Sequence, residues 1–139
     1  MSLSRKTASE KFSQDVCDTL EYLNMSGVKF VTRIEKGRYS SKGCDNVEFM
    51  ISANKGESVK PLCKIASGGE LSRVMLAIKS SLVDKDNIPT MIFDEIDAGI
   101  SGITASIVGR KLKEISRHHQ IGMHVISFFT LVGNLSGST

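Results

Sequence analysis

Two groups of residues between Lys64 and Gly102 have the composition of a phosphate-binding site. The first is the run Ser67-Gly68-Gly69-Glu70, which stands just ahead of apolar residues at helical spacing. A helix that begins there would present free N–H groups and the positive end of its dipole, and glycines would let an anion approach the backbone. Ser67 and Glu70 also have the spacing of a capping box, so the sequence predicts a helix starting at Ser67. Many helices that begin this way bind nothing, so this group alone does not decide the chemistry.

The second group is the acidic pair Asp94-Glu95. It follows a short apolar run, Thr90 to Phe93, which is entered through Pro89 and is typical of a buried parallel strand. In open α/β sheets, ligands bind beyond the carboxyl ends of the strands, and Mg²⁺ takes oxygen ligands from carboxylates and substrate phosphates. A neighbouring glutamate can then orient and deprotonate a water molecule. An acidic turn after a strand is common, but both groups in this order, joined by one helix, favour phosphate chemistry.

Both groups resemble motifs of the ABC-type ATPases. Ser67 to Glu70 resembles their signature motif, Met91 to Glu95 their Walker B strand with its catalytic glutamate, and Ile96 to Gly99 the D-loop that follows. The sequence ASGGELSRVMLAIK followed by FDEIDAGISG is most similar to the RecN family of bacterial DNA-repair ATPases, which is related to the SMC proteins. The similarity runs from about Gly43 to His119 and fails after Gln120.

This resemblance implies an α/β fold, namely the C-terminal lobe of an ABC/SMC-type P-loop ATPase head. Such a lobe is a mainly parallel sheet with flanking helices, preceded by a helix and a β-hairpin. The resemblance assigns the general base to Glu95, and it assigns to Asp94 a Mg²⁺ ion held through a water molecule. The nucleotide-binding residues that it implies are Ser67, Gly68, Gly69, Glu70 and Asp97. Ser67 and the two glycines would act on ATP held by the opposite head, and Asp97 would link the two sites.

The resemblance also implies that the full protein couples ATP binding and hydrolysis to the repair and recombination of broken DNA. No G-x-x-x-x-G-K-[ST] loop occurs in the sequence, so we expect residues 1–139 to form a single partial domain. The expected partners are the N-terminal half of the same head, a second head in a head-to-head homodimer, and DNA, with no membrane. ATP and Mg²⁺ are the expected cofactors, but we expect the chain alone neither to hydrolyse ATP nor to bind it tightly. The expected location is the bacterial cytoplasm, at the nucleoid.

Two other classes of function stay open. The same surface could serve as a non-catalytic dimerisation module in an SMC-like chromosome-structure protein, or the chain could be the nucleotide-binding subunit of an ABC transporter. The helix before the hairpin and the sequence Asp97-Ala98-Gly99-Ile100-Ser101 favour the repair type over the transporter.

The segments before the site carry regular patterns. Residues 7–26 predict an amphipathic helix with an apolar face formed by Phe12, Val16, Leu20 and Leu23. By resemblance this helix is the end of a coiled-coil arm, and without the outgoing arm we expect it to project or to pack loosely. Alternating apolar residues predict strands over 28–35 and 47–53, joined as an antiparallel pair by a mobile loop that contains Gly37 and Gly43.

The segments after the site are less regular. Ser101 is the expected N-cap of a helix whose apolar residues are Ile103, Ile107, Val108, Leu112 and Ile115. The resemblance then predicts a strand that ends in a γ-phosphate-sensing histidine near position 126. The chain has Ile126 there, and His124 stands two residues early, so it would need a shifted register to serve. We therefore interpret residues 121–139 as an atypical tail.

Composition narrows the protein's class without identifying its chemistry. The chain has 139 residues, 40% of them hydrophobic and 24% charged, and a net charge of +3, as expected for at most one soluble globular domain. The basic excess is mild and spread along the chain, so it does not by itself argue for nucleic-acid binding. Three cysteines without a C-x-x-C pair indicate neither a zinc site nor a disulfide framework.

Overall fold

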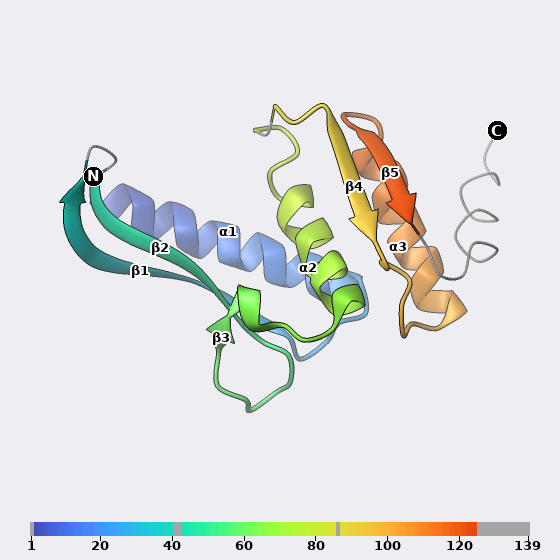
Figure 1. Cartoon of the computed structure of the whole chain (residues 1–139), viewed down its shortest axis with the longest axis horizontal. Helices are drawn as coiled ribbons and strands as arrows, with labels where there is room; N and C mark the ends of the chain where they lie inside the picture. Colours follow the sequence, from blue (N-terminus) through green and yellow to red (C-terminus); the bar gives the residue numbers. More distant parts are fainter. Residues whose placement is uncertain (1, 41–42, 86, 125–139) are drawn as a thin grey trace.

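Three α-helices and two separate sheets make up the part of the chain described by a computed structural model, residues 2–40, 43–85 and 87–124 (Figure 1). The elements in chain order are α1 (Ser2–Tyr22), β1 (Lys29–Ser40), β2 (Gly43–Ser52), β3 (Lys60–Pro61), a 3-10 turn η1 (Leu62–Lys64), α2 (Gly68–Ser80), β4 (Thr90–Asp94), α3 (Gly102–Ile115) and β5 (Gln120–His124). One sheet is antiparallel, in the order β1-β2-β3, and β4 and β5 form a parallel pair. Among the described residues, the parallel sheet expected for the head is thus represented by the β4–β5 pair alone.

The predicted hairpin is confirmed, but its strands are longer than the sequence pattern indicated. They pair from Lys29 opposite Ser52 to Lys36 opposite Asp45, and the pairing resumes after a register shift at Ser40 opposite Gly43. The expectation that Gly37 and Gly43 lie in the connecting loop is therefore wrong, because both lie within the strands. Backbone hydrogen bonds between paired strands need no particular side chains. The pairing of β1 with β2 therefore continues beyond the residues that alternate in hydropathy.

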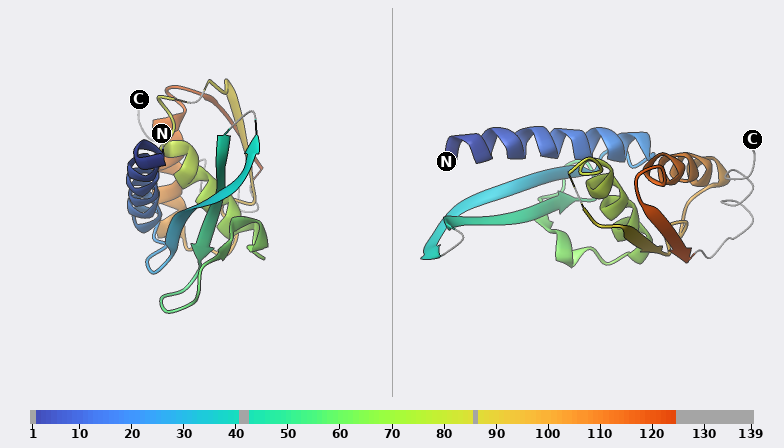
Figure 2. Two further views of the ribbon diagram at one scale, coloured as in Figure 1. Left: turned by 90° about the vertical axis from the view of Figure 1, so that its left-hand side faces the viewer. Right: turned by 90° about the horizontal axis from the view of Figure 1, so that it is seen from above.

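Helix α1 lies along the hairpin (Figure 2), and its C-terminal half packs tightly, contrary to the expectation that the helix would project or pack loosely. Its predicted apolar face is confirmed: Val16 and Leu20 are fully buried, as is Leu23 just after the helix, and Phe12 is half-buried. The Phe12 ring contacts those of Phe30 and Phe49, with centroids 6.0 and 5.7 Å away. The helix is held because the apolar side of the hairpin, which belongs to this chain, covers its apolar face.

The β4–β5 pair is covered on one face by α2 and α3. Met91 and Phe93 are buried against this layer, in the same core cluster as Val74 and Leu112. Between them Ile92 is 79% exposed, so the prediction of a strand buried on both faces is wrong. Successive side chains of a strand point to opposite faces, and no described element covers the face on which Ile92 lies.

Helix α3 begins at Ser101 as predicted, and the Ser101 hydroxyl accepts a hydrogen bond from the Thr104 N–H at 3.3 Å. The expectation that Ile103 lies on the buried face is wrong, since this side chain is 76% exposed. Thr104 takes the buried position, on the same helix face as Val108 and Leu112, and its hydroxyl accepts a hydrogen bond from Asn24 Nδ2 at 3.0 Å. None of the described helices is both long enough and apolar enough to cross a bilayer.

Candidate functional site

The site begins at the N-terminus of α2, where the predicted capping arrangement is confirmed. Ser67 is the N-cap, in an extended conformation, and its hydroxyl accepts a hydrogen bond from the Glu70 N–H at 3.4 Å. Ser67 and Gly68 are exposed, whereas Gly69 is buried. The exposed first turn therefore leaves backbone N–H groups and the positive end of the helix dipole open to an incoming anion.

The acidic pair lies at the carboxyl end of β4, at the same end of the sheet as the start of α2 (Figure 1). Glu95 has a φ of 52°, in the left-handed region that glutamate seldom adopts. Its backbone N–H donates to the carbonyl of His124 at 3.0 Å, so the strand pairing holds the residue in this conformation. Such conformations occur preferentially at functional sites, where the surrounding structure enforces them.

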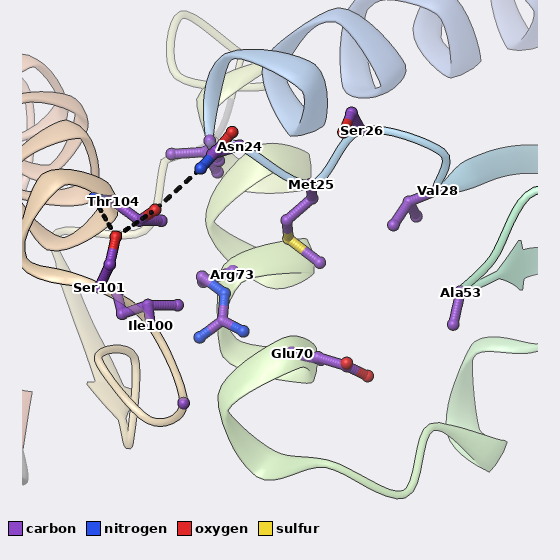
Figure 3. A pocket seen from close by; sticks show the side chains of 12 residues that line it. Asn24, Met25, Ser26, Val28, Ala53, Glu70, Arg73, Ile100, Ser101 and Thr104 are labelled. Carbon is purple, nitrogen blue, oxygen red and sulfur yellow. Dashed lines mark hydrogen bonds between the residues drawn. The ribbon is translucent and has the colours of Figure 1, made fainter.

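The two motifs are in direct contact through the signature glycines. A β-carbon placed on Gly69 would lie 2.8 Å from Cβ and 2.9 Å from the carbonyl oxygen of Ala98, which belongs to the D-loop. A β-carbon on Gly68 would lie 2.5 Å from a carboxylate oxygen of Glu95. Any larger residue at Gly69 would push the helix and the D-loop apart, so glycine is needed there for close approach. Of the sequence-predicted residues, the structure therefore brings Gly68 and Gly69 together with Glu95 and the D-loop, whereas the Glu70 side chain points towards the Ala53 side of a neighbouring cavity (Figure 3).

Asp97 is buried, with 6% of its surface exposed, although the resemblance assigned it a role between two heads. The D-loop residues that this chain leaves at least partly exposed are Ala98 and Gly99. The loop turns sharply, with a hydrogen bond from the Ala98 N–H to the Glu95 carbonyl at 2.9 Å and a φ of 69° at Gly99. The part of the D-loop that a second molecule could contact is thus mainly the backbone of the turn after Asp97.

Three residues of the site make contacts that sequence reasoning missed. Nδ1 of His124 lies 2.8 Å from Oδ1 of Asp94, because the two residues are register partners in the parallel pair. His124 therefore lies beside Asp94, and the expectation that it would need a shifted register to sense a γ-phosphate stays a prediction. Residues 121–124, which we assigned to an atypical tail, belong to a paired strand. The other two are Ser72, which donates to the carbonyl of Asp94, and Arg73. Position 126 lies outside the described residues.

Arg73 is the buried cation of the site. One guanidinium nitrogen, Nη1, donates to the carbonyls of Ile96 at 3.2 Å and Ala98 at 2.9 Å. Burial lowers the pKa of the Arg73 guanidinium, and the nearby carboxylates of Glu70 and Asp97 oppose that shift. An arginine remains charged in proteins, so a positive charge lies between the signature helix and the D-loop. The signal in the sequence was the four-residue spacing from Gly69, which puts Arg73 on the same helix face.

A cavity of about 290 Å³ lies beside Arg73 (Figure 3). It is lined by the turn after α1, by Ala53, by Glu70 and Arg73 of α2, and by the segment from Gly99 into the start of α3. Figure 3 shows the hydrogen bonds that join Asn24, Thr104 and Ser101 along one wall of this cavity. The junction of α1 with the rest of the fold is therefore directly beside the D-loop.

The residues at the site suit part of a magnesium–nucleotide complex. Asp94 is exposed and offers carboxylate oxygen, the ligand type that Mg²⁺ prefers. No cluster of three or more potential metal ligands occurs within residues 2–40, 43–85 and 87–124. The described residues would therefore place Asp94 beside a Mg²⁺ ion whose direct ligands are mainly water and phosphate.

The sequence comparisons identify the family. DNA repair protein RecN from Treponema pallidum is 47% identical over 128 residues, and that from Haemophilus influenzae is 42% identical over 123; each alignment covers 87% of this chain. This chain belongs to the RecN family. It spans 22% of the length of these RecN relatives. No family model matches the chain.

Solved structures give the fold of this RecN-family chain. The SMC head domain with a coiled coil and joint from Pyrococcus yayanosii has a TM-score of 0.65 at 21% identity, over 96% of this chain and 24% of that chain. A second SMC ATPase structure, from work on ATP-driven dimerization and DNA-stimulated activation, has a TM-score of 0.60 at 20% identity, over 98% and 79%. At such identities the likeness shows the fold alone: this chain has the fold of part of an SMC ATPase head.

Proposed function

We propose that this chain is the C-terminal part of a RecN-type ATPase head and supplies the signature motif, the Walker B acids and the D-loop. The observation that carries the proposal is the contact between Gly69 and Ala98, which brings the exposed start of α2 and the acidic end of β4 to one edge of the fold. In the whole protein, this edge would couple ATP binding and hydrolysis to the repair of DNA double-strand breaks.

Each site residue has a role in this proposal. Asp94 holds Mg²⁺ through a water molecule, and Glu95 removes a proton from the attacking water. Ser67 and the two glycines after it contact the γ-phosphate of ATP held by a second head, where free N–H groups complement its charge. Asp97, buried behind the D-loop turn, holds that turn against the partner. Hydrolysis then needs two heads, and DNA is the proposed cargo of the dimer.

The test uses a complete head, made by joining this chain to the N-terminal segment and C-terminal strand of a RecN relative. Glu95→Gln keeps the shape of the side chain and removes the base, so turnover should fall by about 10²- to 10⁴-fold while ATP-bound dimers accumulate. Ser67→Arg should leave ATP binding to each head intact and abolish dimerisation and turnover together. Loss of ATP binding by the isolated Ser67→Arg head would contradict the assignment across the dimer.

The same measurements separate the proposal from a dimerisation module without catalysis. Such a module would form ATP-dependent dimers equally well with Glu95 or glutamine and would release phosphate at the same background rate in both cases. If Glu95 is a proton acceptor, the heads with glutamate and with glutamine at this position should instead differ in turnover and bind ATP equally well.

The chain alone should neither bind ATP tightly nor hydrolyse it. Phosphoryl transfer depends on positioning and charge stabilisation, and the sequence contains no lysine-bearing phosphate loop. Asp94 by itself would hold Mg²⁺ weakly, because the ion would keep most of its water. Phosphate release by the purified chain with Mg²⁺ and ATP, abolished by Glu95→Gln, would mean that a complete site is present here.

A further inference from the structure

Arg73 makes an unusual connection between two segments that are 23 to 25 residues apart in sequence. Its side chain leaves the second turn of α2 and ends at the D-loop, where it binds the carbonyls of Ile96 and Ala98. Figure 3 shows the guanidinium pointing from α2 towards the loop that leads to Ile100 and Ser101. The residue is 6% exposed, so these bonds are largely shielded from solvent.

An arginine at this position carries a cost in stability. Burying a guanidinium costs free energy, and its Nε has no hydrogen-bond partner in the described part of the chain. An apolar side chain of similar length would fill the same space without either cost, but it would remove the hydrogen bonds to the carbonyls of Ile96 and Ala98. What an apolar side chain could not do is hold two carbonyls of one turn in a fixed relation to a helix.

The D-loop needs such a contact because its turn lacks the regular backbone hydrogen bonds of a strand pair. Left-handed conformations occur at Glu95 and Gly99, on both sides of the two carbonyls. Gly69 allows close approach, and Ser72 binds the carbonyl of Asp94 at the end of β4. The contacts made by Gly69, Ser72 and Arg73 thus all come from the first two turns of α2, the end that carries the signature motif.

We propose that Arg73 is a positioning residue that fixes the D-loop to the signature helix, so that both present one rigid surface to the opposite head. This role rests on the proposed function of the two motifs. A head in which the D-loop moved independently of Ser67 would bind its own ATP normally, but it would meet the partner's ATP in many geometries. Turnover would fall, because reacting groups displaced by even about 1 Å can lose about 10²-fold in rate.

The first test measures the link directly in this chain by hydrogen–deuterium exchange. Arg73→Met keeps the aliphatic stem and removes the donors, and Arg73→Lys keeps the charge without the planar fork. Hydrogen bonds from a charged group are strong enough to change a local opening equilibrium about tenfold each. Exchange in peptides spanning 94–100 should therefore rise about tenfold or more in Arg73→Met and less in Arg73→Lys. Peptides from β1 and β2 should not change.

The matched control is Arg110→Met, which removes an exposed arginine from α3. It should leave exchange in residues 94–100 at the level of the unsubstituted chain. Unchanged exchange there in both Arg73 variants, or an equal increase throughout the chain, would overturn the positioning role. Arg73→Lys decides the question if Arg73→Met does not fold.

The second test is the kinetics of the complete head. Both Arg73 variants should lower kcat by about tenfold or more while the affinity of the isolated head for ATP stays unchanged, a pattern expected when only the geometry of the reacting state is lost. An equal loss of ATP affinity would indicate a general structural role and overturn the proposal. If the unsubstituted head itself fails to hydrolyse ATP, the proposed function fails, whereas the exchange result still decides whether Arg73 fixes the D-loop.

Discussion

Replacing Gly69 with alanine tests the contact between the signature helix and the D-loop. In an unobstructed helix this change would stabilise the fold by up to about 1 kcal/mol, because alanine has the higher helix propensity. Here the new β-carbon would lie 2.8 Å from Ala98 Cβ, 2.9 Å from Ala98 O and 3.0 Å from Glu95 O. Carbon atoms in contact prefer separations of about 3.5–4.0 Å, so the backbone of the D-loop must move. Since overpacking of this kind typically costs about 1–3 kcal/mol, we expect a net loss of stability of about 1–2 kcal/mol.

The assay is urea and thermal unfolding of the chain. A loss of this size corresponds to a fall in Tm of about 3–7 °C for a domain of this length. The matched control is Gly68→Ala, where the β-carbon would meet only the Oε2 and Cδ atoms of the Glu95 side chain, at 2.5 and 3.6 Å. That flexible carboxylate can turn aside, so the Tm should stay within about 3 °C of the original. Equal or higher stability in Gly69→Ala than in Gly68→Ala would refute the contact.

Substitutions at three further positions test the packing of the fold. Leu112→Ala, at a residue 1% exposed in the core, should lower stability by about 2–5 kcal/mol, seen as a lower urea midpoint at an unchanged m-value. Asn24→Gly tolerates the positive φ of 61° and loses the hydrogen bond to Thr104, so it should lower stability by about 1 kcal/mol. Asn24→Ala adds left-handed backbone strain and should cost about 1–2 kcal/mol more. Equal losses of stability in the two variants would rule out that strain. His119→Leu removes the ring contact with the Ile88 carbonyl at 2.6 Å and should raise proteolytic cleavage before β4, whereas an unchanged cleavage rate would show that this contact does not hold the segment.

Several features were predictable from the sequence because they depend on neighbouring residues. The starts of α2 and α3 follow from Ser67 and Ser101, each of which caps an N–H group three residues ahead. The hairpin follows from alternation with a period of two, and the buried face of α1 follows from helical spacing. The likeness to RecN also came from a continuous stretch of sequence, and the comparisons confirm it.

Other features required contacts between distant residues. Ile92 has the hydropathy of a buried residue, yet it is exposed, because burial depends on which faces of the sheet other elements cover. His124 meets Asp94 only because β5 pairs with β4 in one register, and a shift of one residue would turn its side chain to the other face. Short-range signals contain no information about either choice.

Arg73 shows the division most plainly. Its sequence context places it on the face of α2 that also carries Gly69, and this much follows from the helical period. Whether that face meets solvent, an apolar core or a turn of backbone carbonyls is decided by how β4 and the D-loop fold back against the helix. The structure puts two carbonyls within 3.2 Å of its guanidinium, and hydrogen bonds act only over such distances. The sequence by itself therefore determined where the motifs start, and the tertiary structure alone decided that a buried arginine joins them.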